Sequence, residues 1–151
     1  MQGVWKLSFA ARRGGSAAAQ QLVPKRIRFG ALAADSSVGL IEVPYQQRLS
    51  GRWQLIAGPP EASGAQSARF VLTSDDVLLL FDGLYVGERV AGTVYDGRSG
   101  AGEVFTTDPL FHPEAPWRSA ADAAEHELGE FLCTRLFTFW GPPSPAASSD
   151  A

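Results

Sequence analysis

Hydrophobic and polar residues alternate along most of this chain with the period of two that is typical of β-strands buried on one face. Trp5, Leu7 and Phe9 alternate with polar neighbours, and Ile27 and Phe29 alternate with arginines. Further alternating segments are residues 38–45, 52–55, 69–73, 89–95 and 103–107. Because these segments are short and are separated by Gly, Pro, Asp and Ser clusters, they predict an all-β, mainly antiparallel fold of about eight or nine strands. We expect an up-and-down β-barrel or a sandwich.

Three segments depart from this alternation. Val77–Phe81 is apolar at every position, which predicts a strand covered on both faces. Phe131–Trp140 is the longest and most aromatic of the predicted strands. Residues 119–127 predict one short surface helix, because Ser119 is a good N-cap and the residues after it include few large apolar side chains.

Turn and tail residues mark the ends of the predicted elements. Asp82-Gly83 predicts a turn or bulge, and Asp96-Gly97 predicts a hairpin. From Gly141 the chain is rich in Pro, Ala and Ser, a composition that continues neither a helix nor a central strand. In a chain of 151 residues and 16.1 kDa, we therefore expect one β-barrel domain over residues 1–140 and an exposed tail over residues 141–151.

The composition is that of an ordinary globular protein, with 45% hydrophobic and 19% charged residues. The net charge of −3 disfavours a nucleic-acid partner, because phosphate contacts require a basic surface. The single cysteine, Cys133, excludes an internal disulfide and a zinc site built from cysteines. No apolar run approaches the ~20 residues of a membrane span. Residues 1–6 lack a secretory signal pattern, so we expect an intracellular protein, in an organelle if a targeting segment has been removed.

Charge is distributed unevenly along the chain. Residues 1–69 carry a net charge of +6 and residues 70–151 carry −9. Strands from the two halves can mix around a closed sheet and cancel this difference, or the basic half can form a face for an acidic partner or for anionic lipid headgroups. Arg26 and Arg28 share one face of a predicted strand. That face is either a solvated surface that resists aggregation or an electrostatic docking site.

Groups suited to catalysis are scarce. The two histidines, His112 and His126, lie in a proline-flanked loop and near the end of the predicted helix, so they do not converge on rigid elements as a metal site requires. Cys133 lies in the middle of an apolar strand, where a thiol is buried and inert. The segment around Ser99 lacks the glycine pattern of the nucleophile elbow of hydrolases. We therefore expect no catalytic residue, no metal and no cofactor.

The pattern Gly-x-Trp-x-Leu occurs twice, at Gly3–Leu7 and at Gly51–Leu55. A glycine at the start of a strand allows backbone or a ring to approach closely, and the tryptophan then closes one end of a barrel. The first copy resembles the signature of the lipocalins and the wider calycin group, in which an arginine of the last strand packs over the tryptophan. Arg135 matches that arginine, although an arginine among aromatic rings also stacks for purely structural reasons. The resemblance implies an interior that holds a small apolar ligand, lined by Trp5, Trp53, Phe70, Arg135 and Phe137.

Two functions stay open at this point. The first is a non-enzymatic accessory subunit, a small barrel that docks on a larger protein assembly in an organelle or at a membrane. Its candidate contacts are Arg26, Arg28, Pro142 and Pro143. The second is a lipocalin-like carrier of a small hydrophobic ligand, a lipid or a pigment. A carrier needs an internal cavity of about 300 Å³ or more, whereas an accessory barrel is filled by its own side chains.

Overall fold

A computed structural model describes residues 1–12, 21, 23–32, 37–46, 48–57, 65–75, 77–99, 102–103, 105, 108, 110 and 117–136. Three candidate contact residues, Phe137, Pro142 and Pro143, lie outside the described residues, as do His112 and the predicted tail.

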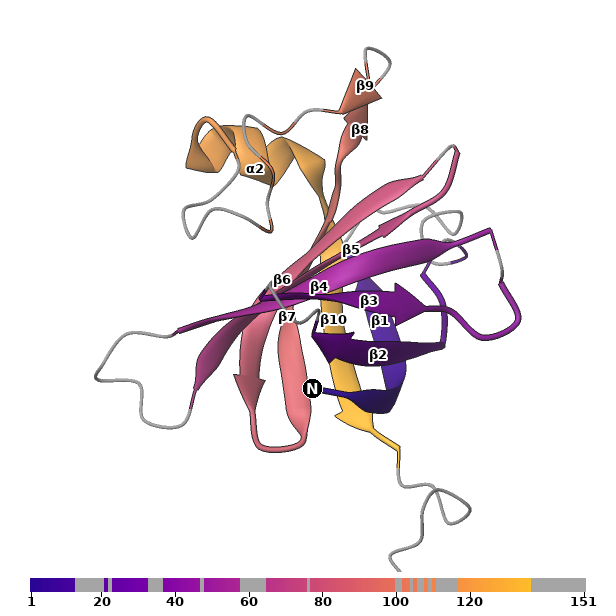
Figure 1. Cartoon of the computed structure of the whole chain (residues 1–151). Coiled ribbons are helices and arrows are strands. Elements are labelled where there is room, and N and C mark those ends of the chain that lie inside the picture. Colours follow the sequence, from indigo (N-terminus) through magenta and orange to yellow (C-terminus); the bar gives the residue numbers. More distant parts are fainter. Residues whose placement is uncertain are drawn as a thin grey trace, which may run out of the picture.

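Eight strands form a closed barrel (Figure 1). In chain order they are β1 (Gly3–Ala11), β2 (Arg26–Leu32), β3 (Val38–Glu42), β4 (Ser50–Ala57), β5 (Gln66–Thr73), β6 (Leu78–Val86), β7 (Arg89–Asp96) and β10 (Glu127–Arg135). Each strand pairs antiparallel with the next in this order, and β10 closes the barrel on β1 from Trp5↔Arg135 to Ala11↔Gly129. The predicted all-β, antiparallel fold is confirmed, and of its two expected forms it is the barrel.

The chain leaves the barrel between β7 and β10. There it forms a two-stranded hairpin from β8 (Arg98–Ser99) and β9 (Gly102–Glu103), and then the helix α2 (Ala120–His126). Ser119 caps this helix, because its Oγ accepts a hydrogen bond from the Asp122 backbone N–H at 3.1 Å. The predicted helix is confirmed, and it buries none of its own residues.

Because neighbouring strands are antiparallel, the loops that connect them lie alternately at the two ends of the barrel. One end, called the Trp5 end, holds the start of β1, the Gly87–Glu88 turn between β6 and β7, and the end of β10. The other end, called the helix end, holds the loop of residues 43–49 between β3 and β4, the turn of residues 74–77 and the excursion that contains α2 (Figure 1).

Aromatic rings in mutual contact fill the barrel interior. Phe70 stacks on Phe81 with ring centroids 4.3 Å apart. Phe70 also meets Phe29 at 5.2 Å and Phe131 at 5.5 Å in edge-to-face geometry, and Phe29 meets Trp53 at 5.7 Å. These are the arrangements that aromatic pairs prefer, and each is worth about 0.5–1.5 kcal/mol beyond the burial of its area. The interior is therefore a packed core.

A second apolar cluster lies on the outer face of β6. Leu78 and Leu80 belong to it and are 5% and 0% exposed, together with Leu110 and Trp117 of the excursion that follows β7. The excursion thus covers the outer face of this strand while the aromatic core covers its inner face. This arrangement confirms the predicted burial on both faces of the segment Val77–Phe81.

The turn or bulge predicted at Asp82-Gly83 is wrong, because both residues lie inside β6 and pair with both neighbouring strands without a register shift. Asp82 pairs across the sheet with Arg69 of β5, with 3.3 Å between Oδ1 and Nε. At Gly83 an added Cβ atom would come within 2.2 Å of the Ala91 carbonyl oxygen. Asp82 thus forms a cross-strand ion pair, and Gly83 allows two strands to approach closely. The reversal itself lies at Gly87, whose φ is 63°.

The boundaries around the excursion also differ from expectation. Asp96-Gly97 does not fold the chain back onto β7, because the chain continues into β8, which pairs with β9. β9 comprises Gly102–Glu103, and most of the strand predicted over residues 103–107 lies outside the described residues. The last strand does not begin at Phe131 but at Glu127, directly after α2. Its predicted continuation beyond residue 136 lies outside the described residues.

Candidate functional site

Arg135 packs over Trp5, as the sequence pattern predicts, and closes the Trp5 end of the barrel. Its guanidinium carbon lies 4.6 Å from the centroid of the tryptophan ring, a cation–π contact. The guanidinium also donates to the Gln2 carbonyl and pairs with Glu88 of the β6–β7 turn. Gly3 permits this approach, because its φ is 118° and an added Cβ atom would lie 3.1 Å from Arg135 Nη1. Arg135 therefore has a structural role, and its charge is paired with that of Glu88.

The other described interior candidates are buried, as the sequence predicts. Trp5 and Phe70 are 0% exposed and Trp53 is 2% exposed. Trp53 Nε1 donates to the Gly30 carbonyl at 3.1 Å, and its indole occupies space that a Cβ atom at Gly39 would enter to within 2.3 Å. The rings are thus held by neighbouring side chains and backbone.

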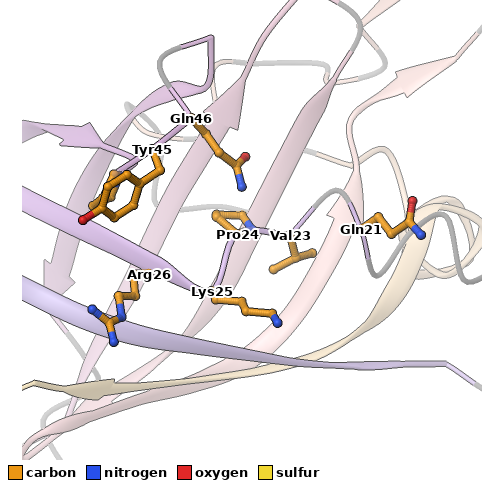
Figure 2. Close-up of a pocket in the computed structure, with 8 residues that line it drawn as sticks. Gln21, Val23, Pro24, Lys25, Arg26, Tyr45 and Gln46 are labelled. Carbon is orange, nitrogen blue, oxygen red and sulfur yellow. The ribbon is translucent and has the colours of Figure 1, made fainter.

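A hollow of about 590 Å³ opens on the surface at the helix end, between the start of β2 and the loop that follows β3 (Figure 2). Its walls are Gln21, Val23, Pro24, Lys25, Arg26, Pro44, Tyr45 and Gln46. Figure 2 shows Tyr45 and Arg26 on one side and Gln21 on the opposite side. Because Val23 and Pro24 are buried, they form an apolar floor. Amide, guanidinium and ammonium groups provide the polar contacts.

Two neighbouring hollows share walls with the first. One, of about 600 Å³, lies between the segment Val23–Arg26 and β1, where Lys6 and Ser8 line it. The other, of about 160 Å³, shares Gln21 and Gln46 with the first and adds Arg48. The two larger hollows therefore share Val23, Lys25 and Arg26.

Four cations, Lys6, Lys25, Arg26 and Arg48, line these hollows, and none of the described lining residues is a carboxylate. The excess of cations around the hollows contrasts with the whole chain, which has 16 Asp and Glu but 13 Lys and Arg. None of the four forms an ion pair within the described part of the chain. Their positive field is therefore not cancelled locally. We call the three hollows with these four cations the cationic groove.

Tyr45 stands at the rim of the cationic groove in an unusual backbone conformation. It is 99% exposed and has a φ of 66°. It is the third residue of a turn that begins at Val43 and has Pro44 in second place, closed by a hydrogen bond from the Gln46 N–H to the Val43 carbonyl at 3.2 Å. A positive φ at that position favours glycine or asparagine. A fully exposed aromatic ring thus occupies a strained position where the fold does not need one.

The two arginines predicted as docking contacts differ in their surroundings. Arg26 lines the cationic groove. Arg28 lies two residues further along β2, where it pairs with Glu42 at 3.3 Å, and both side chains are exposed. Sequence reasoning found Arg26 but missed Lys6, Arg48 and Tyr45, because the pairing of β1 and β3 with β2 brings β1 and the loop after β3 beside the start of β2.

Cys133 is fully buried in β10, as the sequence predicts. Burial in this apolar setting raises the pKa of its thiol to about 12. At neutral pH the thiol is therefore protonated, and it is a poor nucleophile.

The helix α2 carries three neighbouring side chains of the types that bind metal ions, those of Asp122, Glu125 and His126. Their potential ligand atoms lie within 4.8 Å of one another, because helical spacing places residues three and four apart on one face. Asp122 is already engaged by the Arg118 backbone N–H and guanidinium, and the His126 ring stacks on Trp117 with centroids 5.0 Å apart. Asp122 and His126 thus already have partners within the described part of the chain.

Comparison of the chain with protein-family models, with curated proteins and with solved structures gives no significant match. Within the described residues, no helix is long and apolar enough to span a membrane.

Proposed function

We propose that this chain is a non-enzymatic accessory subunit, a small β-barrel that docks on a larger protein assembly. The observation that carries the proposal is the packed interior. Phe70 contacts Phe29, Phe81 and Phe131 at centroid distances of 4.3–5.5 Å. Rings at these separations occupy the space that a carrier barrel reserves for its ligand, so the interior serves stability and leaves the outer surface for recognition.

The outer surface supports the same function. The cationic groove provides hollows of about 590 and 600 Å³, both of which open to the surface. Tyrosine and arginine are enriched among the residues that dominate protein interfaces. Tyr45 and Arg26 lie together on one wall of the first hollow (Figure 2).

The chemistry of the described residues favours recognition over catalysis. Cys133 is held as a buried thiol with its pKa raised to about 12, and His126 lies against Trp117. An acyl- or group-transfer site needs a nucleophile beside a base that a third group orients. Among the described residues, the pKa of Cys133 is shifted by burial alone, and His126 is grouped with two carboxylates and no nucleophile.

Sedimentation of a tagged chain, gently extracted from its own source, tests the proposal. We expect the chain to sediment with a particle several times its own 16.1 kDa mass. High salt should release it, because the contacts we assign are largely ionic. A chain that sediments alone under every gentle condition, and that carries an extractable lipid or pigment, would instead be a carrier.

A further inference from the structure

The fold holds two positive charges directly opposite each other at the cationic groove. Lys6 of β1 and Arg26 of β2 are register partners, and both are exposed. Directly opposed residues of antiparallel strands lie about 5 Å apart, and like charges there destabilise the sheet. Lys25 adds a third charge beside Arg26. A negatively charged ligand would relieve this repulsion.

Tyr45 is a second feature that lowers the stability of the protein without a ligand. Its positive φ of 66° disfavours any side chain, and its ring is 99% exposed, so it gains no packing in return. Strain of this kind is typical of residues that contact a ligand. The ring lies beside Arg26 (Figure 2), which places an apolar anchor next to the cations.

The shape of the cationic groove favours a polypeptide segment over a bilayer. A bilayer is a broad surface that needs cations and exposed apolar anchors on the same side of the protein. Here Tyr45 is at the helix end and Leu40 lies in the middle of β3, whereas the other exposed large apolar side chains, Leu32, Leu84 and Val86, lie toward the Trp5 end. The two larger hollows, which share Val23, Lys25 and Arg26, suit a narrow chain.

We propose that the cationic groove binds an extended acidic segment of a partner protein. Its carboxylates contact Lys6, Lys25 and Arg26, and an apolar residue of the segment packs on Tyr45 in the hollow floored by Val23. This inference rests on the proposed docking function and names the chemistry of the partner.

Fluorescence anisotropy with a labelled peptide of alternating glutamate and leucine tests this site on the full chain. A peptide with glutamine in place of glutamate is the matched ligand control. Arg26→Glu should weaken binding of the glutamate peptide roughly tenfold, since it reverses a central charge. Tyr45→Gly should weaken it by a similar factor, since it removes the anchor. Arg89→Glu, an equal charge change at an exposed site on the Trp5 end, should change it less than about twofold.

Both groove variants should keep the fold. Arg26→Glu places a carboxylate opposite Lys6, and Tyr45→Gly relieves the positive φ, so neither should lower the melting temperature. Loss of binding without loss of stability would support the site. Equal affinity for the two peptides, or unchanged binding in both variants, would overturn it. Binding of phosphatidylserine vesicles without binding of the peptide would overturn it in favour of a lipid surface. Co-sedimentation with a larger particle would still stand after either failure, so the two proposals are separable.

Discussion

Replacement of Phe70 by alanine tests whether the barrel interior is packed. The side chain is 0% exposed and contacts three other rings within 5.5 Å. Truncation of a buried phenylalanine costs about 3–5 kcal/mol, which includes the cavity left behind. Because three aromatic pairs are lost and strands enclose the site on all sides, we expect a loss of about 4–5 kcal/mol. A domain of this size has about 5–15 kcal/mol of stability, so the variant should still fold.

Urea unfolding followed by tryptophan fluorescence gives the free energy of unfolding of both proteins. Phe70→Leu keeps most of the volume and should lose only about 1–2 kcal/mol. Tyr45→Ala removes an aromatic ring that is 99% exposed and should change the stability by less than about 0.5 kcal/mol. Benzene should stabilise Phe70→Ala, because an apolar cavity binds small aromatic molecules, and it should not stabilise the unmodified chain.

A loss below about 1 kcal/mol for Phe70→Ala would refute the reasoning, because it would mean that the ring borders open space. Stabilisation of the unmodified chain by benzene would have the same meaning. Either result would indicate that the barrel has an internal cavity, as a ligand carrier does.

Three other substitutions make further predictions. Cys133 has a pKa raised from 9.0 to about 12 in the folded chain, so the unfolded thiol ionises first and the free energy of unfolding should fall as the pH rises through that interval. Urea titrations against Cys133→Ala, whose pH dependence should be flatter, measure this difference. Gly39→Ala would place a Cβ atom 2.3 Å from Trp53 Nε1 and should cost about 2–4 kcal/mol, and near-UV circular dichroism should report the displaced indole. Ser119→Ala should cost about 1 kcal/mol in α2, seen as faster amide exchange in that helix, and faster exchange throughout the barrel would contradict the assignment.

Much of the fold could be predicted because each strand of the barrel has one buried face, so that hydrophobic and polar residues alternate along it. Trp5, Leu7 and Phe9 or Ile27 and Phe29 indicate both the strand and its inner face. Prediction failed where a polar residue has a partner far away in the sequence. Asp82 resembles a turn residue, yet it pairs with Arg69 of the neighbouring strand, and no local pattern reveals that contact.

The candidate site was less predictable, since proximity in space defines it. Arg26 could be singled out by its alternation, but its opposition to Lys6 depends on the register of β1 and β2. Arg48 joins through the loop that follows β3. Tyr45 carries a weak signal, a proline before it in a loop, but only the backbone shows its positive φ. Residues scattered over three elements carry no shared sequence pattern, so the cationic groove could be recognised only from the pairing of β1, β2 and β3.

Native mass spectrometry of the chain, isolated from its own source under gentle conditions, tests the central claim most directly. We predict that the chain is released from a larger complex as a 16.1 kDa subunit without a bound small molecule. A free 16.1 kDa monomer that carries a few hundred daltons of additional mass would contradict the account, because it would identify the chain as a carrier of a small ligand and not as a docked subunit.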